Sequence, residues 1–340
     1  MQAAKSPFDI YGAANICGAL EFQTSLEQIV YPQNSEGRFS RTSGLKVDRS
    51  IDARKTLFER LKVASQYILP KRGLTTLAGR IAEAEKGELT TRLIRWFVGK
   101  YAVDMSEAEN PDISSYNSFN AFFTRPLKAG ARSITEADFA CPVDGAISQL
   151  GAIDDHSILQ AKGHSFTTTE LLGGDSALAA KFRNGGFANL YLSPKDYHRL
   201  HMPCDGTLTN MIYVPGSLFS VNPTTARGVP NLFARNERVI CVFESPEHGT
   251  FAMVLVGATI VGSMATVWHG LVKPKPANKI TQWTYADQNI ALEKGEEMGR
   301  FLLGSTVIML FRPDTIAFSA DWAPERPVRL GETMGNRPGL

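Results

Sequence analysis

The hydrophobic pattern of about residues 51–104 has a helical period. Apolar side chains recur three or four positions apart, as one face of a helix requires. They are Leu57, Leu61, Ala64, Ile68, Leu74, Leu77, Ile81, Leu89, Leu93, Trp96 and Phe97. Pro70 and Gly73 interrupt the period, so it predicts three consecutive helices. Lysine and arginine flank the apolar stripes, so these helices either bind an anionic membrane surface or pack on the protein with their basic faces in water.

From about residue 105 onward, short apolar runs alternate with turn residues, which is typical of β-strands. The predicted strands cover residues 145–150, 188–192, 207–214, 238–244, 251–261, 266–271 and 306–311. One helix is predicted over residues 168–182, and Asp205-Gly206 is typical of a tight turn. The predicted fold class is therefore α+β, with an N-terminal amphipathic helical region followed by a β-rich domain.

Three parts follow from these patterns. Residues 1–50 form a poorly defined N-terminal extension, which includes a linker-like stretch rich in Gly, Ser and Arg at 37–44. Residues 51–104 form the helical region, and residues 105–340 form the β-rich domain. With 340 residues, of which 43% are hydrophobic and 21% are charged, the chain is long and apolar enough for a substantial core.

Composition excludes several classes of protein. A formal net charge of +2 is too balanced to indicate a nucleic-acid-binding protein. The four cysteines form no CxxC pair, which favours a reducing compartment. The first residues lack the layout of a secretory signal, and the longest apolar stretch, 251–264, is interrupted by glycine and is too short to span a bilayer. We therefore expect a soluble or peripheral protein.

Two of the six histidines, His198 and His201, lie in one polar segment after a predicted strand. Histidine is the side chain best suited to move protons near neutral pH. The HxxH spacing can also bind a metal, but no cysteine or carboxylate is evidently paired with it as a further ligand, so we predict no metal site. A structural pair that bonds to the backbone is the other alternative.

The bond between Gly304 and Ser305 enters an apolar run and can be a site of self-cleavage. Glycine has no Cβ to hinder attack by the Ser305 hydroxyl on the preceding carbonyl, and it tolerates a strained backbone. If the resulting ester eliminates, Ser305 becomes dehydroalanine. Its hydrolysis releases ammonia and leaves a pyruvoyl group, a ketone that forms a Schiff base with a substrate amine. The tripeptide by itself is more typical of a turn or a strand entry.

Asp144 precedes Gly145, and an Asp-Gly pair before a strand is most often a turn former. Asp144 can also orient a histidine, in which case Asp144, His201 and Ser305 form a triad that acts on the chain's own backbone. The apolar segment 213–222 either covers a lipid-accepting pocket or is a plain surface loop. For the charged segment 231–238, a solvated turn with local ion pairs is the better interpretation.

Taken together and in this order, these motifs resemble the phosphatidylserine decarboxylase proenzymes of the bacterial and mitochondrial type. The resemblance runs from about Ser65 to the predicted strand after Ser305 and excludes the first fifty residues. The matching stretches are Phe-Asn-Ala-Phe-Phe-Thr-Arg-Pro-Leu at 119–127, Pro-Val-Asp-Gly at 142–145, Lys-Gly-His at 162–164, Tyr-His-Arg-Leu-His-Met-Pro at 197–203, residues 231–237, Val-Gly-Ala-Thr-Ile-Val-Gly-Ser at 256–263 and Leu-Gly-Ser-Thr at 303–306.

The resemblance implies that Asp144, His201 and Ser305 carry out self-cleavage, with His201 as the base. Cleavage before Ser305 would give a large chain, 1–304, and a small chain, 305–340, which stay associated. The small chain would begin with a pyruvoyl group derived from Ser305. A homodimer of the cleaved heterodimer is also compatible with the resemblance.

The implied activity is that of a lyase in phospholipid biosynthesis. It converts phosphatidylserine to phosphatidylethanolamine and carbon dioxide through a Schiff base on the pyruvoyl group, without a metal or pyridoxal phosphate. His198 resembles the residue that donates a proton to the α-carbon after carbon dioxide leaves. Phe219 and Ser220 match positions near the substrate.

A diacyl lipid substrate is confined to the bilayer, so the resemblance favours membrane docking by the amphipathic helices. It implies peripheral attachment to the cytoplasmic face of the inner membrane, and it implies no nucleic-acid partner. Two other functions fit the same residues. One is a serine hydrolase that acts on an external ester, although Ser305 lacks a GxSxG elbow. The other is a non-catalytic lipid-binding module.

Overall fold

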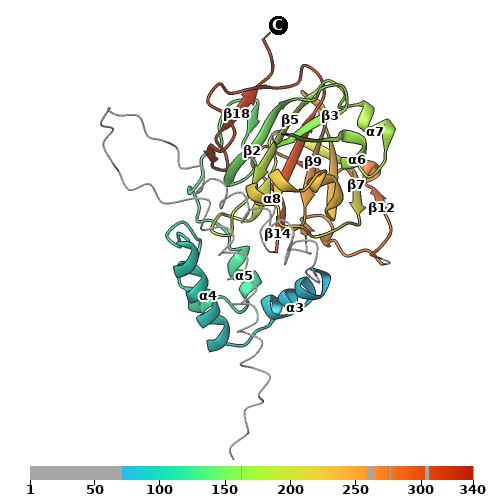
Figure 1. The fold of residues 1–340 in the computed structure, drawn as a ribbon. Helices are drawn as coiled ribbons and strands as arrows, with labels where there is room; N and C mark the ends of the chain where they lie inside the picture. The colour runs from blue at the N-terminus through green and yellow to red at the C-terminus, as the bar shows by residue number, and fades with distance from the viewer. Residues whose placement is uncertain (1–70, 162, 259–263, 276, 303–305, 340) are drawn as a thin grey trace, which may run out of the picture. The chain divides into compact units, whose positions relative to one another are not determined.

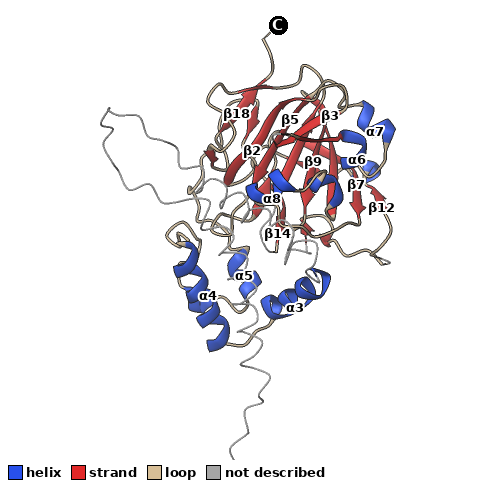
Figure 2. Cartoon of the chain, in the orientation of Figure 1, coloured by secondary structure: helices blue, strands red, loops and turns tan. Residues whose placement is uncertain are grey.

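The computed structural model describes residues 71–339 apart from residues 162, 259–263, 276 and 303–305 (Figure 1). Contacts divide the chain into two units, Met1–Pro70 and Lys71–Leu340, and the described residues all belong to the second. Helices dominate the N-terminal part of the described chain, and strands make up most of the remainder (Figure 2). This confirms the α+β class.

Three sequence predictions lie outside the described residues. They are the N-terminal extension, the first predicted helix around residues 57–68 and the bond between Gly304 and Ser305. The two residues that flank the last of these gaps, Leu302 and Thr306, are described, so the surroundings of the predicted cleavage site can be built from both sides.

The largest sheet has nine strands, and all of its pairings are antiparallel. Its main path runs in the order β12 (Thr281–Thr284), β7 (Gly206–Val214), β8 (Arg238–Ser245), β9 (Gly249–Val256), β15 (Thr306–Phe311), β5 (Gly186–Tyr191), β2 (Gly145–Ala152) and β17 (Pro327–Val328), and β13 (Ala291–Leu292) also pairs with β7. Strand β15 is central, because each of its residues is paired with β9 on one side and β5 on the other. All of its side chains are buried.

Three smaller sheets accompany it. A four-stranded sheet has the order β11 (Gly270–Leu271), β10 (Met264–Thr266), β14 (Glu297–Phe301) and β6 (Arg199–His201); a three-stranded sheet has the order β1 (Phe139–Ala140), β18 (Thr333–Asn336) and β16 (Ala317–Phe318); and β3 (Ser157–Ala161) pairs with β4 (His164–Thr167). Buried side chains of the nine-stranded sheet, such as Leu190 and Met309, join those of the four-stranded sheet, such as Leu200 and Met298, in one hydrophobic cluster. The two sheets therefore pack against each other.

Two of the predicted amphipathic helices are confirmed as α3 (Lys71–Glu83) and α4 (Glu88–Tyr101). The apolar face of α4 packs on α5 (Phe119–Phe123), where the Phe97 ring meets the Phe119 ring edge-on at 5.1 Å. Phe97 is buried and thus belongs to the protein's own packing, and membrane docking by the helical region stays a prediction. Leu77 and Leu89 remain 43% and 45% exposed. A short 3₁₀ helix, η1 (Ile113–Ser115), follows α4 in the sequence.

Five of the predicted strands, 145–150, 188–192, 207–214, 238–244 and 306–311, are confirmed as β2, β5, β7, β8 and β15. The predicted strand at 251–261 matches β9 up to Val256. Two predictions are wrong because glycines break the element. The helix at 168–182 is divided into α6 (Thr168–Leu171) and α7 (Ser176–Ala180) by Gly173 and Gly174, whose φ angles are 75° and 93°. The strand at 266–271 is a hairpin of β10 and β11 in which Gly270 has a φ of 70°.

Candidate active site

The candidate site is assembled around Tyr191, the last residue of β5. Tyr191 pairs with Ala146 of β2 on one side and with Thr306 of β15 on the other. Asp144 comes just before β2, and Ser305 comes just before β15. Two segments far apart in the sequence therefore enter the sheet at the same level, although Ser305 itself lies outside the described residues.

Gly145 is required for this arrangement by close packing. A Cβ atom at this position would lie 2.4 Å from the backbone oxygen of Tyr191, well inside contact distance. The Asp-Gly pair, which the sequence suggests as a turn former, thus allows β2 to approach the end of β5. As a consequence Asp144 lies beside the segment that leaves β5 and carries the two histidines.

The chain before Ser305 is fixed to the same segment. Phe301, the last residue of β14, donates its backbone N–H to the backbone oxygen of His198 at 3.0 Å. Residues 302–305 therefore connect a position beside His198 to a position beside Tyr191. The structure thus brings Asp144, His198, His201 and both flanks of the predicted cleavage site into one region.

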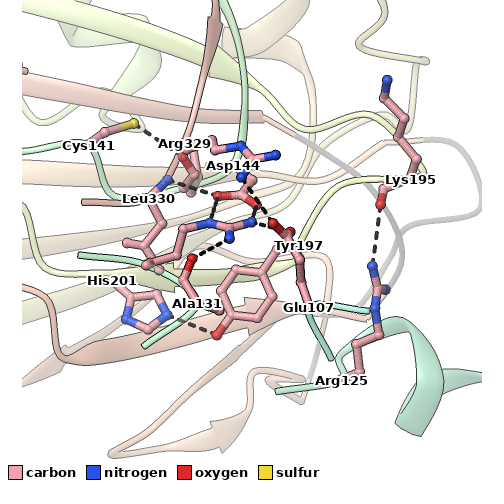
Figure 3. A network of polar contacts seen from close by, with 12 residues as sticks. Glu107, Arg125, Ala131, Cys141, Asp144, Lys195, Tyr197, His201, Arg329 and Leu330 are labelled. Carbon is pink, nitrogen blue, oxygen red and sulfur yellow. Dashed lines mark hydrogen bonds and ion pairs between the residues drawn. The ribbon is translucent and has the colours of Figure 1, made fainter. Parts of the chain in front are cut away.

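Asp144 is held by a buried ion pair and not by a histidine (Figure 3). Its Oδ1 atom accepts from Arg132 Nε at 3.0 Å and from the Leu330 backbone N–H at 2.8 Å, and its Oδ2 atom accepts from Arg132 Nη2 at 2.5 Å. Arg132 also bonds Glu107 at 2.7 Å, and Glu107 pairs with Arg329 at 3.0 Å. The hydrogen bond from Arg132 is the main cause that lowers the pKa of Glu107. Asp144 thus stabilises the chain around Leu330.

His201 has a partner for each ring nitrogen. Nδ1 lies 2.7 Å from the Gly295 carbonyl oxygen. Nε2 lies 3.0 Å from the Tyr197 hydroxyl (Figure 3). Because a carbonyl only accepts, Nδ1 must carry the proton, so neutral His201 presents a basic Nε2 that accepts from Tyr197. Burial lowers the pKa of His201, and it is opposed first by the hydrogen bond to Gly295, then by the charge of Glu297 and last by that of Asp144. Asp144 makes no hydrogen bond with His201 in the part of the chain that the structure describes.

His198 is fully buried and stacks on Phe123 of α5, with ring centroids 4.0 Å apart and planes 19° apart. Among the described residues neither ring nitrogen has a hydrogen-bond partner. Burial, followed by the nearby positive charge of Arg125, lowers the pKa of His198 to about 3. The backbone of Ser193 and Pro194 opposes this shift without reaching hydrogen-bonding geometry. His198 is therefore neutral at physiological pH and is available to a group that is not part of the described chain.

Phe219 and Ser220 are also buried, and Asn236 connects their segment to β9. Asn236 bonds both backbone groups of Phe219 and donates to the Gly257 oxygen at 2.8 Å. Gly257 follows Val256, which pairs with Thr306, so Phe219 and Ser220 lie on a segment tied to the strand that follows Ser305. Two short helices, α8 (Pro223–Gly228) and α9 (Leu232–Arg235), lie between Ser220 and Asn236 in the sequence.

The expectation of a solvated turn at 231–238 is wrong for two of its residues. Asn236 is 0% exposed and Arg238 is 2% exposed. The Arg238 guanidinium donates to three backbone oxygens, those of Leu171, Asn236 and Glu170, at 2.6–2.8 Å. Polar residues in this segment are therefore structural links within the core rather than solvent contacts.

Sequence reasoning missed four residues of the site. Glu107 and Arg132 stand in no recognisable motif, and only the fold brings them to Asp144. Tyr197 and Arg125 lie inside quoted motifs, the Tyr-His-Arg-Leu-His run and the Phe-Phe-Thr-Arg-Pro run. Because both residues stand in motifs that mix polar and aromatic side chains, the motifs could have indicated a role in the site. The spacing of the motifs does not reveal which groups these residues contact.

The described cysteines form no disulfide bonds: Cys141, Cys204 and Cys241 are buried and free. Across the described residues, no cluster of three or more His, Cys, Asp and Glu side chains is arranged to hold a metal ion. None of the described helices combines the length and apolarity that crossing a membrane requires. The final 3₁₀ turn, η2 (Ala286–Gln288), lies between β12 and β13 in the sequence.

Comparison with known proteins agrees with the geometry. A family model described as phosphatidylserine decarboxylase matches residues 119–336, and a second model described as PSD matches residues 61–102. The chain is 67% identical over 278 residues to a phosphatidylserine decarboxylase proenzyme of Dechloromonas aromatica (strain RCB). The aligned stretch covers 82% of this chain and 98% of the relative. A proenzyme of the same name from Azoarcus sp. (strain BH72) is 66% identical, over 82% of this chain and 96% of the relative. Another from Variovorax paradoxus (strain S110) is 64% identical, over 83% of this chain and 99% of the relative.

Proposed function

The chain belongs to the phosphatidylserine decarboxylase family, and we propose that it is a self-processing, pyruvoyl-dependent carboxy-lyase. It converts phosphatidylserine to phosphatidylethanolamine and carbon dioxide in phospholipid biosynthesis. The observation that carries this proposal is the convergence at Tyr191, where the chain that leads from Ser305 pairs beside the strand that follows Asp144. The adjoining segment supplies both histidines.

Self-cleavage begins with attack of the Ser305 hydroxyl on the Gly304 carbonyl. His201 accepts the serine proton at Nε2, since its Nδ1 proton is already donated to Gly295. The hydrogen bond to Gly295 and then the charge of Glu297 favour the protonated form of His201, and the charge of Asp144 adds a smaller effect in the same direction. Asp144 therefore acts chiefly by fixing the surrounding chain, without a direct hydrogen bond to the histidine.

The residues around position 305 fit a pyruvoyl group. The two ring nitrogens of His198 and the Thr306 hydroxyl are buried and lack hydrogen-bond partners in the described chain. When formed, the pyruvoyl group supplies a ketone that condenses with the substrate amine and draws electrons from the bond to the departing carboxylate. His198 delivers the proton to the α-carbon, and Phe123 holds its ring in place. Phe219 and Ser220 lie near the bound substrate and contribute to its binding.

The cleaved chains stay together because of where β15 lies. The small chain, 305–340, contributes this strand to the middle of the nine-stranded sheet, and the large chain, 1–304, supplies both neighbours. Separating the two chains would break backbone hydrogen bonds on both edges of β15 and expose its buried side chains.

The enzyme works at the surface of the membrane that holds its lipid substrate. We assign it to the cytoplasmic face of the inner membrane as a peripheral protein. The exposed Leu77 and Leu89, together with the basic residues of α3 and α4, supply an apolar and cationic contact of the kind that binds anionic bilayers.

Mass spectrometry of the purified protein under denaturing conditions tests the proposal. We expect two chains that separate after Gly304, with the small chain beginning with a group of pyruvoyl mass. Ser305→Ala should remain a single chain. An intact wild-type chain that retains Ser305 yet hydrolyses external esters would instead establish a serine hydrolase.

A second comparison distinguishes the roles of the two histidines. His201→Ala should block cleavage, because no base remains to activate Ser305. His198→Ala should be cut yet lose decarboxylation of phosphatidylserine, measured as release of carbon dioxide. If His198→Ala stays uncut although it folds, the proposed division of labour is wrong.

A further inference from the structure

Arg125 is a buried cation without a carboxylate partner. It is 4% exposed, and none of the ion pairs among the described residues includes it. Its Nη2 atom makes one long hydrogen bond, 3.4 Å, to the Lys195 backbone oxygen, and its Nε atom has no partner (Figure 3). Burial lowers the pKa of Arg125, and Asp144, Asp196 and Glu107 oppose this only through their distant charges. A buried charge with so few bonds is costly to keep.

Two other buried arginines show how the protein normally satisfies such a group. Arg132 pairs with the carboxylates of Asp144 and Glu107. Arg238, 2% exposed, has no carboxylate partner but donates to three backbone oxygens at 2.6–2.8 Å. Arg125 has neither arrangement, so its bonding capacity is unfilled in the chain by itself.

The position of Arg125 links it to the proposed chemistry. The chain enters it from α5, where Phe123 stacks on His198, and the guanidinium lies 5.3 Å from the centre of the Phe122 ring. Its bond to Lys195 ties it to the segment that carries His198. The positive charge of Arg125 contributes to the low pKa of His198, as expected for two groups that lie near each other. Arg125 Nε and both ring nitrogens of His198 are buried without a hydrogen-bond partner among the described residues.

We propose that Arg125 binds the phosphate of the lipid headgroup. This rests on the proposed function, because the substrate then carries two anionic groups, a phosphodiester and a carboxylate. The carboxylate loses its charge as carbon dioxide leaves, so a cation bound to it would stabilise the substrate more than the transition state. The phosphate keeps its charge throughout the reaction and is present in substrate and product alike. Arginine is well suited to phosphate because its planar fork donates two parallel hydrogen bonds.

Phosphate binding would also change His198. An anion on Arg125 offsets the positive charge that disfavours protonation of the histidine. Burial of His198, the larger cause of its low pKa, is unaffected, so the bound headgroup removes only the part of the shift that Arg125 contributes.

The test is binding of glycerophosphoethanolamine to the cleaved enzyme, measured by isothermal titration calorimetry. This soluble headgroup has the phosphodiester and lacks the carboxylate. Because charged hydrogen bonds are lost, Arg125→Gln should weaken its binding by about tenfold to hundredfold, and Arg125→Lys should bind with intermediate affinity. Binding of free serine, which has a carboxylate and no phosphate, should be unchanged. In turnover of phosphatidylserine the KM should rise.

Arg238→Gln is the matched control, since it removes a buried arginine that the chain itself satisfies. This variant should lower the midpoint of thermal unfolding without weakening the binding of glycerophosphoethanolamine to the folded protein. Unchanged binding of glycerophosphoethanolamine in both Arg125 variants would overturn the inference, as would a selective loss of serine binding. A gel that shows normal cleavage, with turnover by the wild-type enzyme, separates these outcomes from a failure of the proposed function.

Discussion

His201 illustrates at the residue scale how a motif can name a group without naming its partners. The order of motifs suggests that Asp144 orients this histidine, as in a serine-protease triad. The structure gives the orienting role to the Gly295 carbonyl, which fixes the tautomer, and places the Tyr197 hydroxyl on the basic nitrogen. In the proposed self-cleavage, the bond from Tyr197 must break before His201 can accept a proton from Ser305.

Tyr197→Phe removes that competing bond and should therefore accelerate self-cleavage. A net hydrogen-bond contribution of about 1 kcal/mol corresponds to roughly a fivefold faster rate. The rate is measured by following the appearance of the small chain on denaturing gels during synthesis in a cell-free system.

Tyr213→Phe is the control for loss of a buried tyrosine hydroxyl, because Tyr213 donates to Glu237 at 2.9 Å and not to a histidine. Its cleavage rate should match that of the wild-type protein. Slower cleavage of Tyr197→Phe would mean that the Tyr197 hydroxyl aligns the His201 ring for catalysis instead of blocking its Nε2 atom.

At the scale of elements, the C-terminal segment is bound to the remainder of the fold in two ways. Strand β15 lies in the middle of the largest sheet, and the turn at Arg329 and Leu330 is tied to Glu107 and Asp144. Arg132 bridges those two carboxylates from the other side. One buried guanidinium thus organises contacts among three distant segments.

Arg132→Met should destabilise the fold by about 3 kcal/mol or more, because it leaves the largely buried Asp144 without its cation and leaves Glu107 with the exposed Arg329 alone. The free energy of unfolding is measured by guanidinium titration in the uncut Ser305→Ala background, so that both forms contain one chain.

Arg183→Met provides a matched comparison. Arg183 and Asp155 also approach to 2.5 Å, but their side chains are 58% and 57% exposed, against 7% and 12% for Arg132 and Asp144. The exposed pair should contribute less than about 1 kcal/mol. Equal losses for the two substitutions would show that burial does not set the strength of the Arg132 network.

At the scale of the whole molecule, the apolar residues of the helical region divide between two uses. Ile94 and Phe97 pack against the aromatic residues of α5. Leu77 and Leu89 are left exposed on helices that also carry basic residues. Internal packing therefore accounts for part of the apolar pattern, and membrane binding by the exposed leucines stays a prediction.

Replacing both exposed leucines, Leu77→Glu with Leu89→Glu, should weaken binding to phosphatidylglycerol vesicles by about tenfold or more. Each leucine contributes roughly 1.5–3 kcal/mol when fully buried, and the new charges are repelled by the anionic surface. Co-sedimentation with vesicles measures the change.

Leu159→Glu serves as the control, because Leu159 is 47% exposed and lies in β3, outside the helical region. It should bind vesicles as the wild-type protein does. If the double variant also binds normally, the exposed leucines do not dock on the membrane.

Local sequence determined the elements and the chemical groups. Periods of two and of three to four placed most strands and two helices correctly, because side-chain spacing reflects local backbone geometry. The errors occurred where glycines break the pattern, at Gly173, Gly174 and Gly270. The motifs around Asp144, His198, His201 and Ser305 identified the family, since their residue types and order are specific.

Only the tertiary structure decided which groups meet. Spacing could not reveal that Asp144 bonds Leu330, or that Arg125 lacks a partner for its Nε atom among the described residues. Hydrogen-bond partners and burial depend on segments that are far apart in the sequence, whereas propensity acts over a few residues. For this reason the sequence by itself specified the strand after Ser305 and the histidines, and the packing of β2, β5 and β15 brought their surroundings together at Tyr191.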